Sequence, residues 1–368
     1  MKPHIKKYHD FYNLVPNAGI IQTEFGFYCF DRWKKEGYIN DDTDTGKLFG
    51  FEWIGKHCLG ELGWCEAPLL PEFKVEVLED RGEHELVRDF AGRSVLYFKG
   101  KRDGFMPEYV DHPVKDMKTF EENIKWRLDP NSPERYKDLE TRMKLAMERQ
   151  NDDECPICQS VIGGYMYLRS LIGPEDLLYK FYDSPELIHA CMQAWFDISD
   201  RVISEHQKYV SLDELFLAED ICYKSGPLIS PDMMREFLFP YYQQLINNIK
   251  KRQLSDRKLH IQIDTDGNAL PVIDVYKEIG MDFMSPFEVA SDCDVVEIRK
   301  KYPDLLMLGG FDKRILAQGK DAIDREVDRI MPFMKEKGGY IPTCDHGVPE
   351  EVNFEDYMHY RKRMAEYK

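Results

Sequence analysis

Side chains able to do acid–base or metal chemistry follow five short apolar runs in the second half of the sequence. The runs are ELFLA, LHIQI, MDFMS, LLMLGG and GGYIP. The residues after them are Glu219 and Asp220, then Asp264 and Asp266, then Glu288, then Asp312, and finally Cys344, Asp345 and His346. Carboxylates that converge raise one another's pKa unless a cation lies between them. The pattern therefore indicates either a metal site or paired acid/base carboxylates.

The tripeptide Asp264-Thr265-Asp266 has two readings. Alternate residues of a strand share a face, so both carboxylates could point into one cavity. Together with one imidazole they could bind zinc or another divalent ion. In the other reading, the aspartates cap the next helix and shape the turn before Gly267. The spacing alone leaves both open.

The apolar runs have the length of strands, and helical patterns lie between them. Helices are expected to begin at Ser132-Pro133, Ser184-Pro185 and Ser230-Pro231, with a kink in the third at Pro240. Repeated strand, loop and helix predict parallel strands with helical crossovers. The glycine fingerprint of a dinucleotide-binding unit is missing from the sequence. We therefore predict an α/β fold of the (β/α)₈ TIM-barrel type, with its site at the C-terminal ends of the strands.

The first part of the chain has a different character. Residues 1–130 are irregular and rich in aromatic residues, with short strands expected in FKVEVLED, ELVRDF and SVLYFKG. We interpret 1–130 as a layer or lid on a single domain of residues 1–368, with 131–368 forming most of the barrel. Such an aromatic-rich layer would suit a homodimer interface.

Composition narrows the range of partners. The net charge is −17 and the pI is near 5.1, so nucleic acid and anionic membrane surfaces are disfavoured. No apolar run reaches the roughly 18 residues of a membrane span, and the start lacks the apolar core of a signal peptide. Nine scattered cysteines are typical of a reducing cytoplasm. Cys155 and Cys158 form a lone CxxC in an apparent strand with no second pair at zinc-ribbon spacing, so packing is favoured over metal or redox use.

Two tyrosines in GGYMYLRSLIG are further candidates. Tyr165 and Tyr167 could line a pocket for substrate or cofactor, and structural packing explains them equally well. Glu288 and Asp312 belong to the same set of candidate binding residues, because each follows a predicted strand. Arg169 is expected to pair with a nearby acid.

Several segments together resemble the uroporphyrinogen decarboxylase-like superfamily, which includes the haem-pathway decarboxylase and cobalamin-dependent methyltransferases. The matching segments are GFMPEYVDHPVKDMKTFEENIKWRLDPNSPERY, AEDICYKSGPLISPDMMREFLFPYY, DTDGNALPVID, MSPFEVASDCDV, GGFDKR and YIPTCDHGVPEEVNFEDYMHY. The resemblance runs over nearly the whole chain. It implies a (β/α)₈ barrel, in agreement with the pattern of strands and helices.

The resemblance carries over residue by residue only in part. The decarboxylase's arginine-rich N-terminal motif has no counterpart in GIIQTEFGFYCFDRW, whereas its late His-Gly matches His346-Gly347. The methyltransferase zinc ligands of the His-x-Cys-Gly-Asn and later Cys-Gly motifs fall on Asp264, Asp266 and His346. The resemblance thus implies a metal held by oxygen and nitrogen, with Glu219 and Cys344 as further candidate ligands. Such a set suits Lewis-acid activation of an oxygen substrate.

Three functions follow as hypotheses. The first is a corrinoid-dependent methyltransferase, in which zinc or another divalent metal activates a methyl ether or alcohol and Asp220 or Asp345 manages the proton. Cobalamin, or another corrinoid on a partner corrinoid protein, would carry the methyl group. The second is a decarboxylase or other lyase on a smaller carboxylate, with His346 and Asp220 as the acid/base pair and no metal. The third is a barrel that binds a tetrapyrrole without chemistry.

Overall fold

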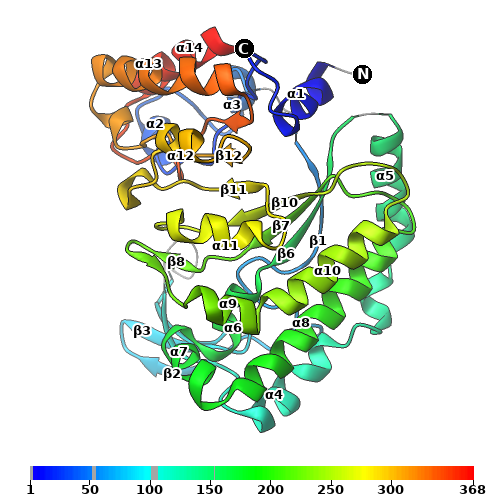
Figure 1. Cartoon of the computed structure of the whole chain (residues 1–368). Helices are drawn as coiled ribbons and strands as arrows, with labels where there is room; N and C mark the ends of the chain where they lie inside the picture. The colour runs from blue at the N-terminus through cyan, green and yellow to red at the C-terminus, as the bar shows by residue number, and fades with distance from the viewer. Residues whose placement is uncertain (1–2, 52–54, 101–106, 153) are drawn as a thin grey trace.

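The computed structural model describes residues 3–51, 55–100, 107–152 and 154–368 (Figure 1). Its centre is a sheet of seven parallel strands in the order β1-β6-β7-β10-β11-β12-β13. Their bounds are β1 His57–Leu62, β6 Ile157–Ile162, β7 Glu214–Ala218, β10 His260–Asp264, β11 Phe283–Ser285, β12 Leu306–Leu308 and β13 Tyr340–Ile341. The last five of these are the five apolar runs, so the predicted α/β class with parallel strands is confirmed.

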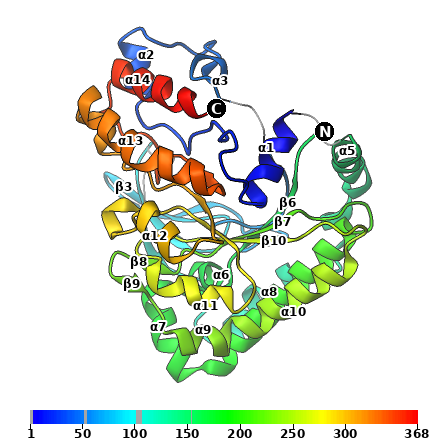
Figure 2. The same cartoon turned by 45° about the horizontal axis from the view of Figure 1, so that its top comes forward.

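Helices follow the strands and cover the outer face of the sheet. They are α6 Gly164–Ile172, α7 Pro174–Asp183, α8 Pro185–His206, α9 Pro231–Phe237, α10 Phe239–Arg252, α11 Ile273–Lys277, α12 Val295–Lys301, α13 Lys320–Lys337 and α14 Phe354–Met364. Helices α8 and α10 pack side by side (Figures 1 and 2). Strand residues Leu215 and Leu217 are fully buried beneath this layer. Within the described ranges, no helix is both long and apolar enough to cross a membrane.

The predicted helix starts are confirmed at two of the three serines. Ser184 precedes α8, and the Ser230 hydroxyl accepts a hydrogen bond from the Met233 amide at the start of α9. Pro240 marks a break and not a kink, because α9 ends at Phe237 and Pro240 lies in the first turn of α10. A proline is tolerated there since its missing N–H has no partner in a first turn. After Ser132 the chain forms only a short 3₁₀ helix, Pro133–Tyr136, before α5, Leu139–Asn151.

The N-terminal part contains several small elements. Helices α1 Pro3–Tyr12, α2 Phe30–Lys35 and α3 Thr45–Leu48 precede β1, and α4 Met117–Asn123 precedes α5. An antiparallel sheet contains β2 Glu76–Arg81, β3 His84–Arg88, β4 Ser94–Phe98 and β5 Glu108–Asp111. Three of these strands were predicted from alternation. This part also supplies β1 to the main sheet, next to β6.

The two ends of the parallel sheet differ. At the N-terminal ends of the strands, the Tyr12 hydroxyl of α1 donates a 2.8 Å hydrogen bond to Glu214, and the Tyr12 ring stacks on His260. Helix α1 therefore covers this end. At the C-terminal ends the chain forms loops and the small hairpin of β8 Cys222–Tyr223 and β9 Gly226–Pro227. The register places Ala218, Asp264 and Ser285 side by side at this edge.

Candidate metal centre and active site

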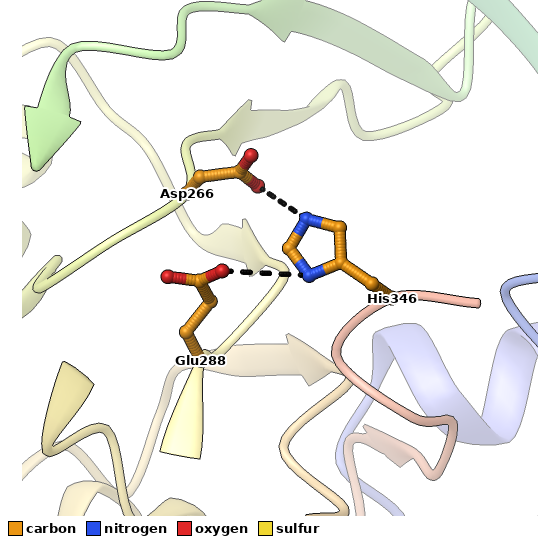
Figure 3. Close-up of side chains that lie close together, drawn as sticks. All are labelled: Asp266, Glu288 and His346. Atoms are coloured by element: carbon orange, nitrogen blue, oxygen red, sulfur yellow. Dashed lines mark ion pairs between the residues drawn. The ribbon is translucent and has the colours of Figure 1, made fainter. Parts of the chain in front are cut away.

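Three side chains from three different strand ends meet at the C-terminal edge of the sheet. Asp266 follows β10, Glu288 follows β11 and His346 follows β13. Figure 3 shows both carboxylates pointing at the imidazole: Asp266 Oδ1 lies 3.2 Å from Nε2, and Glu288 Oε1 lies 3.5 Å from Nδ1. One ligand atom of each residue lies within 4.8 Å of the other two. This cluster of two carboxylates and one imidazole has the donor set of a divalent metal site.

Hydrogen bonds orient Glu288 in this cluster. Its second carboxylate oxygen accepts from the Gly267 amide at 2.8 Å and from the Ser291 hydroxyl at 3.1 Å. Gly267 has a φ of +75°, and a Cβ there would lie 2.7 Å from the Tyr223 backbone. Only glycine fits this position, so the DTDGN turn is shaped to bring the Gly267 amide to Glu288.

The segment that carries His346 is held by the N-terminal part of the chain. The Cys344 amide donates to the Glu24 carboxylate at 2.7 Å, and Phe27 forms a parallel bridge with Val348. The Tyr28 amide also donates to the Val348 carbonyl at 2.9 Å. Residues about 320 positions apart in sequence thus fix the position of the imidazole.

His346 has a strongly shifted protonation equilibrium. Hydrogen bonding to Asp266, and then to Asp345, raises the pKa of His346 to about 10. Burial alone would raise the pKa of Asp345, but His346 and Lys313 outweigh it and lower that pKa. Lys313 lies 3.0 Å from Asp345. The imidazole is therefore a cation among carboxylates, which is the place that a metal ion would take.

Asp264 lies beside this cluster and not in contact with the imidazole. The Ser285 hydroxyl donates to it at 2.6 Å, and the Gln262 amide in turn donates to Ser285 at 2.7 Å. Burial, with smaller contributions from the charges of Asp266 and Asp220, raises the pKa of Asp264 to about 7. Such a carboxyl group can gain or lose a proton near neutral pH.

Asp220 takes part in an ion pair at the same edge. Its carboxylate lies 2.8 Å from the Arg169 guanidinium, so the expected partner of Arg169 is Asp220. Burial raises the pKa of Asp220 although Arg169 opposes the shift. Asp220 also has a φ of +42°, which is strained for a residue with a side chain and is typical of functional sites.

The remaining candidates from the sequence are buried within the fold. Glu219 is fully buried and accepts from the Tyr242 hydroxyl at 2.5 Å and the Tyr165 amide at 3.0 Å. Tyr165 and Tyr167 are buried, and their hydroxyls lack hydrogen-bond partners among the described residues. Cys344 is fully buried, and burial raises its pKa well above the usual value. Asp312 pairs with Arg314 at 2.8 Å.

An open cavity of about 460 Å³ adjoins the cluster. Its lining includes Arg169, Asp220, Tyr223, Asp266 and Glu288. Charged side chains of both signs therefore face one space that is large enough for a small organic molecule. Sequence reasoning had named Glu288 as a binding residue and had not considered it as a metal ligand, although it follows a strand in the same way as Asp266.

The donor atoms of the cluster fit a divalent cation. Two carboxylates and an imidazole converge within 4.8 Å, and Nδ1 of His346 is buried without a well-aligned hydrogen bond in the described part of the chain. Nδ1 lies 3.5 Å from Glu288 and 3.9 Å from Asp345, and Nε2 lies 3.2 Å from Asp266, so both ring nitrogens have carboxylates beside them that can orient the ring. No soft sulfur ligand is among the three residues, so the site is a hard one.

Comparison with known proteins agrees with the fold. The chain matches the uroporphyrinogen decarboxylase (URO-D) family over residues 102–367. A uroporphyrinogen decarboxylase of Geotalea uraniireducens is 25% identical over 134 residues, which is 36% of this chain and 37% of that protein. The solved structure of a methyltransferase from Methanosarcina mazei is similar with a TM-score of 0.60 at 12% identity, covering 99% of this chain and 98% of that one. The chain therefore belongs to the uroporphyrinogen decarboxylase family, and its barrel is of that family's type.

Proposed function

We propose that this protein is a metal-dependent methyltransferase that moves a methyl group between an oxygen substrate and a cobalt corrinoid. The observation that carries the proposal is the cluster of Asp266, Glu288 and His346 beside an open cavity. These residues would hold zinc or another divalent metal, with Glu288 in the position for which the sequence had suggested Asp264. The bound metal would supply Lewis acidity at the oxygen of a methyl ether or alcohol.

The neighbouring residues have roles that follow from their environment. Asp264, with a pKa of about 7, is suited to give a proton to the oxygen that loses its methyl group. Asp345 stays ionised between Lys313 and His346, so it orients the imidazole. Asp220 and Arg169 form a charged pair on the cavity wall that can position the substrate.

The cavity is open to the surface, which would allow a partner protein to dock over it. A corrinoid is large, and a corrinoid protein docked on the C-terminal face of the barrel would bring its cobalt towards the substrate. The cavity opens at this face, which carries the loops after β10 and β11. A methyltransferase from Methanosarcina mazei has a similar fold at 12% identity, so this fold is compatible with methyl transfer.

A second candidate is a decarboxylase or other lyase acting on a small carboxylate. Two observations favour it: the Arg169 guanidinium on the cavity wall could bind a substrate carboxylate, and a uroporphyrinogen decarboxylase is among the relatives. In this reading Asp220 and His346 act as acid and base, and the reaction needs no metal.

The first experiment measures bound metal in the untagged protein by mass spectrometry. We expect about one divalent ion per chain, as for a site with three protein ligands, and its loss in the double variant Asp266→Ala, His346→Ala. The control is His359→Ala. His359 forms an ion pair with Asp324, with 2.8 Å between the two side chains, and this pair does not belong to the cluster. Absence of metal after chelator-free purification and zinc reconstitution would contradict the metal site.

Activity separates the two candidates. The protein, reduced cobalamin and methoxylated aromatic compounds are incubated together, and release of the free phenol is followed by chromatography. Phenol release that depends on both corrinoid and metal supports methyl transfer. Turnover of a carboxylate with release of CO₂ after exhaustive chelation would instead support the decarboxylase.

A further inference from the structure

Two cysteines lie side by side at the end of the barrel opposite the candidate metal centre. Cys58 is the second residue of β1 and Cys158 the second of β6, and the register pairs them directly. Adjacent strands are about 4.8 Å apart, which is within the roughly 4.4–6.8 Å between Cα atoms that a disulfide spans. Paired residues of neighbouring strands point to the same face of the sheet, so the two thiols are neighbours.

The two thiols have different surroundings. Cys58 is exposed, whereas Cys158 is buried. The Cys158 thiol donates to the Glu214 carboxylate at 3.6 Å, and Glu214 pairs with Lys56 at 2.6 Å. One thiol is thus open to small reagents, and the other is held beside it next to a proton acceptor.

The charges around the pair favour a reactive Cys58. Hydrogen bonding with Cys158 lowers the pKa of Cys58, and the nearby Lys56 cation lowers it further. Because a thiol carries one proton, the Cys158 proton turns from Glu214 to Cys58 when it stabilises the Cys58 thiolate. The same hydrogen bond and burial raise the pKa of Cys158 well above its usual value. For Cys29, Cys191 and Cys344, burial raises the pKa, so these thiols are poor nucleophiles.

We propose that Cys58 and Cys158 form a peroxide-sensitive dithiol site that closes to a disulfide between β1 and β6. The Cys58 thiolate attacks one peroxide oxygen, the O–O bond breaks, and the hydroxide released takes up a proton to give water. Cys158 sulfur then attacks the sulfur of the Cys58 sulfenic acid, and the S–O bond breaks. The departing oxygen leaves as a second water with the Cys158 proton, for which Glu214 is the adjacent relay.

In this reaction both sulfurs are oxidised and the peroxide oxygens are reduced. The site is independent of the proposed methyl transfer, because it uses none of the residues of the metal cluster. Hydrogen peroxide is the oxidant, and a thiol reductant such as dithiothreitol restores the dithiol.

The test is peptide mapping of the folded, full-length protein after treatment with hydrogen peroxide. We expect one species with two fewer free thiols than the nine cysteines of the chain. Its digest should contain the Cys58 peptide linked to the Cys158 peptide, and dithiothreitol should reverse the link. In Cys158→Ser, dimedone should trap the Cys58 sulfenic acid. The matched control Cys65→Ser, which changes another partly accessible cysteine, should leave the link intact.

Two results would overturn the proposal. One is a digest in which Cys58 and Cys158 remain free or are oxidised separately while the protein stays folded. The other is a link from Cys58 to Cys155, which would show that the paired strand neighbours are not the reacting thiols. Because the mapping uses the unaltered protein, the result does not depend on whether a variant folds.

Discussion

At the scale of single residues, His346 is the group whose chemistry changes most on metal binding. With Asp266 and Asp345 beside it, its pKa is raised to about 10, so the metal-free imidazole is protonated at pH 8. A metal ion can bind a ring nitrogen only after that proton leaves. Lower pH strengthens the competition from the proton, and metal affinity must therefore fall as the pH falls.

The proton that His346 loses on metal binding can be counted by calorimetry. At pH 8, zinc binding to the metal-free protein should release about one proton, and the affinity should weaken by about tenfold per pH unit below that. Titrations in buffers of different ionisation enthalpy measure the proton count. His359→Ala should give the same count. Zinc binding without proton release would show that His346 is not a ligand.

Two of the three residues of this cluster, Asp266 and His346, were predicted as metal ligands from the sequence. The rule that active residues follow parallel strands placed Asp266, Glu288 and His346 among the candidates, because each lies a few residues after an apolar run, but only Asp266 and His346 were assigned to the metal. It could not show that Asp264 faces Ser285 while Asp266 faces the imidazole, since that depends on how the turn at Gly267 bends. The hydrogen bond from the Cys344 amide to Glu24, which holds the segment of His346, could not be predicted either, because it joins residues far apart in the sequence.

At the scale of elements, the turn from β6 into α6 is packed against the end of β7. A Cβ added at Gly163 would lie 2.4 Å from the Glu219 carboxylate and 2.6 Å from the Glu219 Cα. The Gly163 amide also donates to the Ala218 carbonyl at 2.7 Å, so this turn cannot move away freely. The strand end that carries Asp220 therefore depends on the absence of a side chain at residue 163.

We expect Gly163→Ala to lower the free energy of unfolding by about 3 kcal/mol, because overpacking against backbone atoms is not relieved by a change of rotamer. Urea denaturation measures the loss. Gly60→Ala in β1 is the matched control, because a Cβ there has no neighbour within 4 Å among the described residues. Equal stability of the two variants would contradict the close packing at this turn.

The elements themselves were predicted unevenly. The runs that became β7 and β10–β13 are short and mostly apolar, and nearly all of their residues are buried, which is typical of strands buried on both faces. Strand β1, HCLGEL, escaped notice because only Leu59 and Leu62 in it are buried. The break between α9 and α10 was missed because a proline at 240 fits a kink and a new first turn equally well.

At the scale of the whole molecule, the two ends of the chain pack on each other. The Arg361 guanidinium of α14 donates to the Phe49 carbonyl at 3.0 Å and to the Gln22 side chain at 2.6 Å. The Trp33 indole donates to the Val352 carbonyl at 3.0 Å. The match to the family begins only at residue 102, yet the residues before it hold the segment that carries His346.

A chain of residues 102–368 should therefore not fold on its own. It lacks β1 and the buried side chains of Trp33, Phe49, Leu59 and Leu62. Burial of each contributes roughly 1.5–3 kcal/mol, and together they approach the ~5–15 kcal/mol that stabilises a whole domain. We expect no cooperative thermal transition by circular dichroism and no bound zinc. The control is production of the 102–368 chain together with a separate chain of residues 1–101. This should restore the cooperative thermal transition and the bound zinc. Cooperative unfolding of the 102–368 chain alone would show that the first part is a separate layer and that the domain does not extend over residues 1–368.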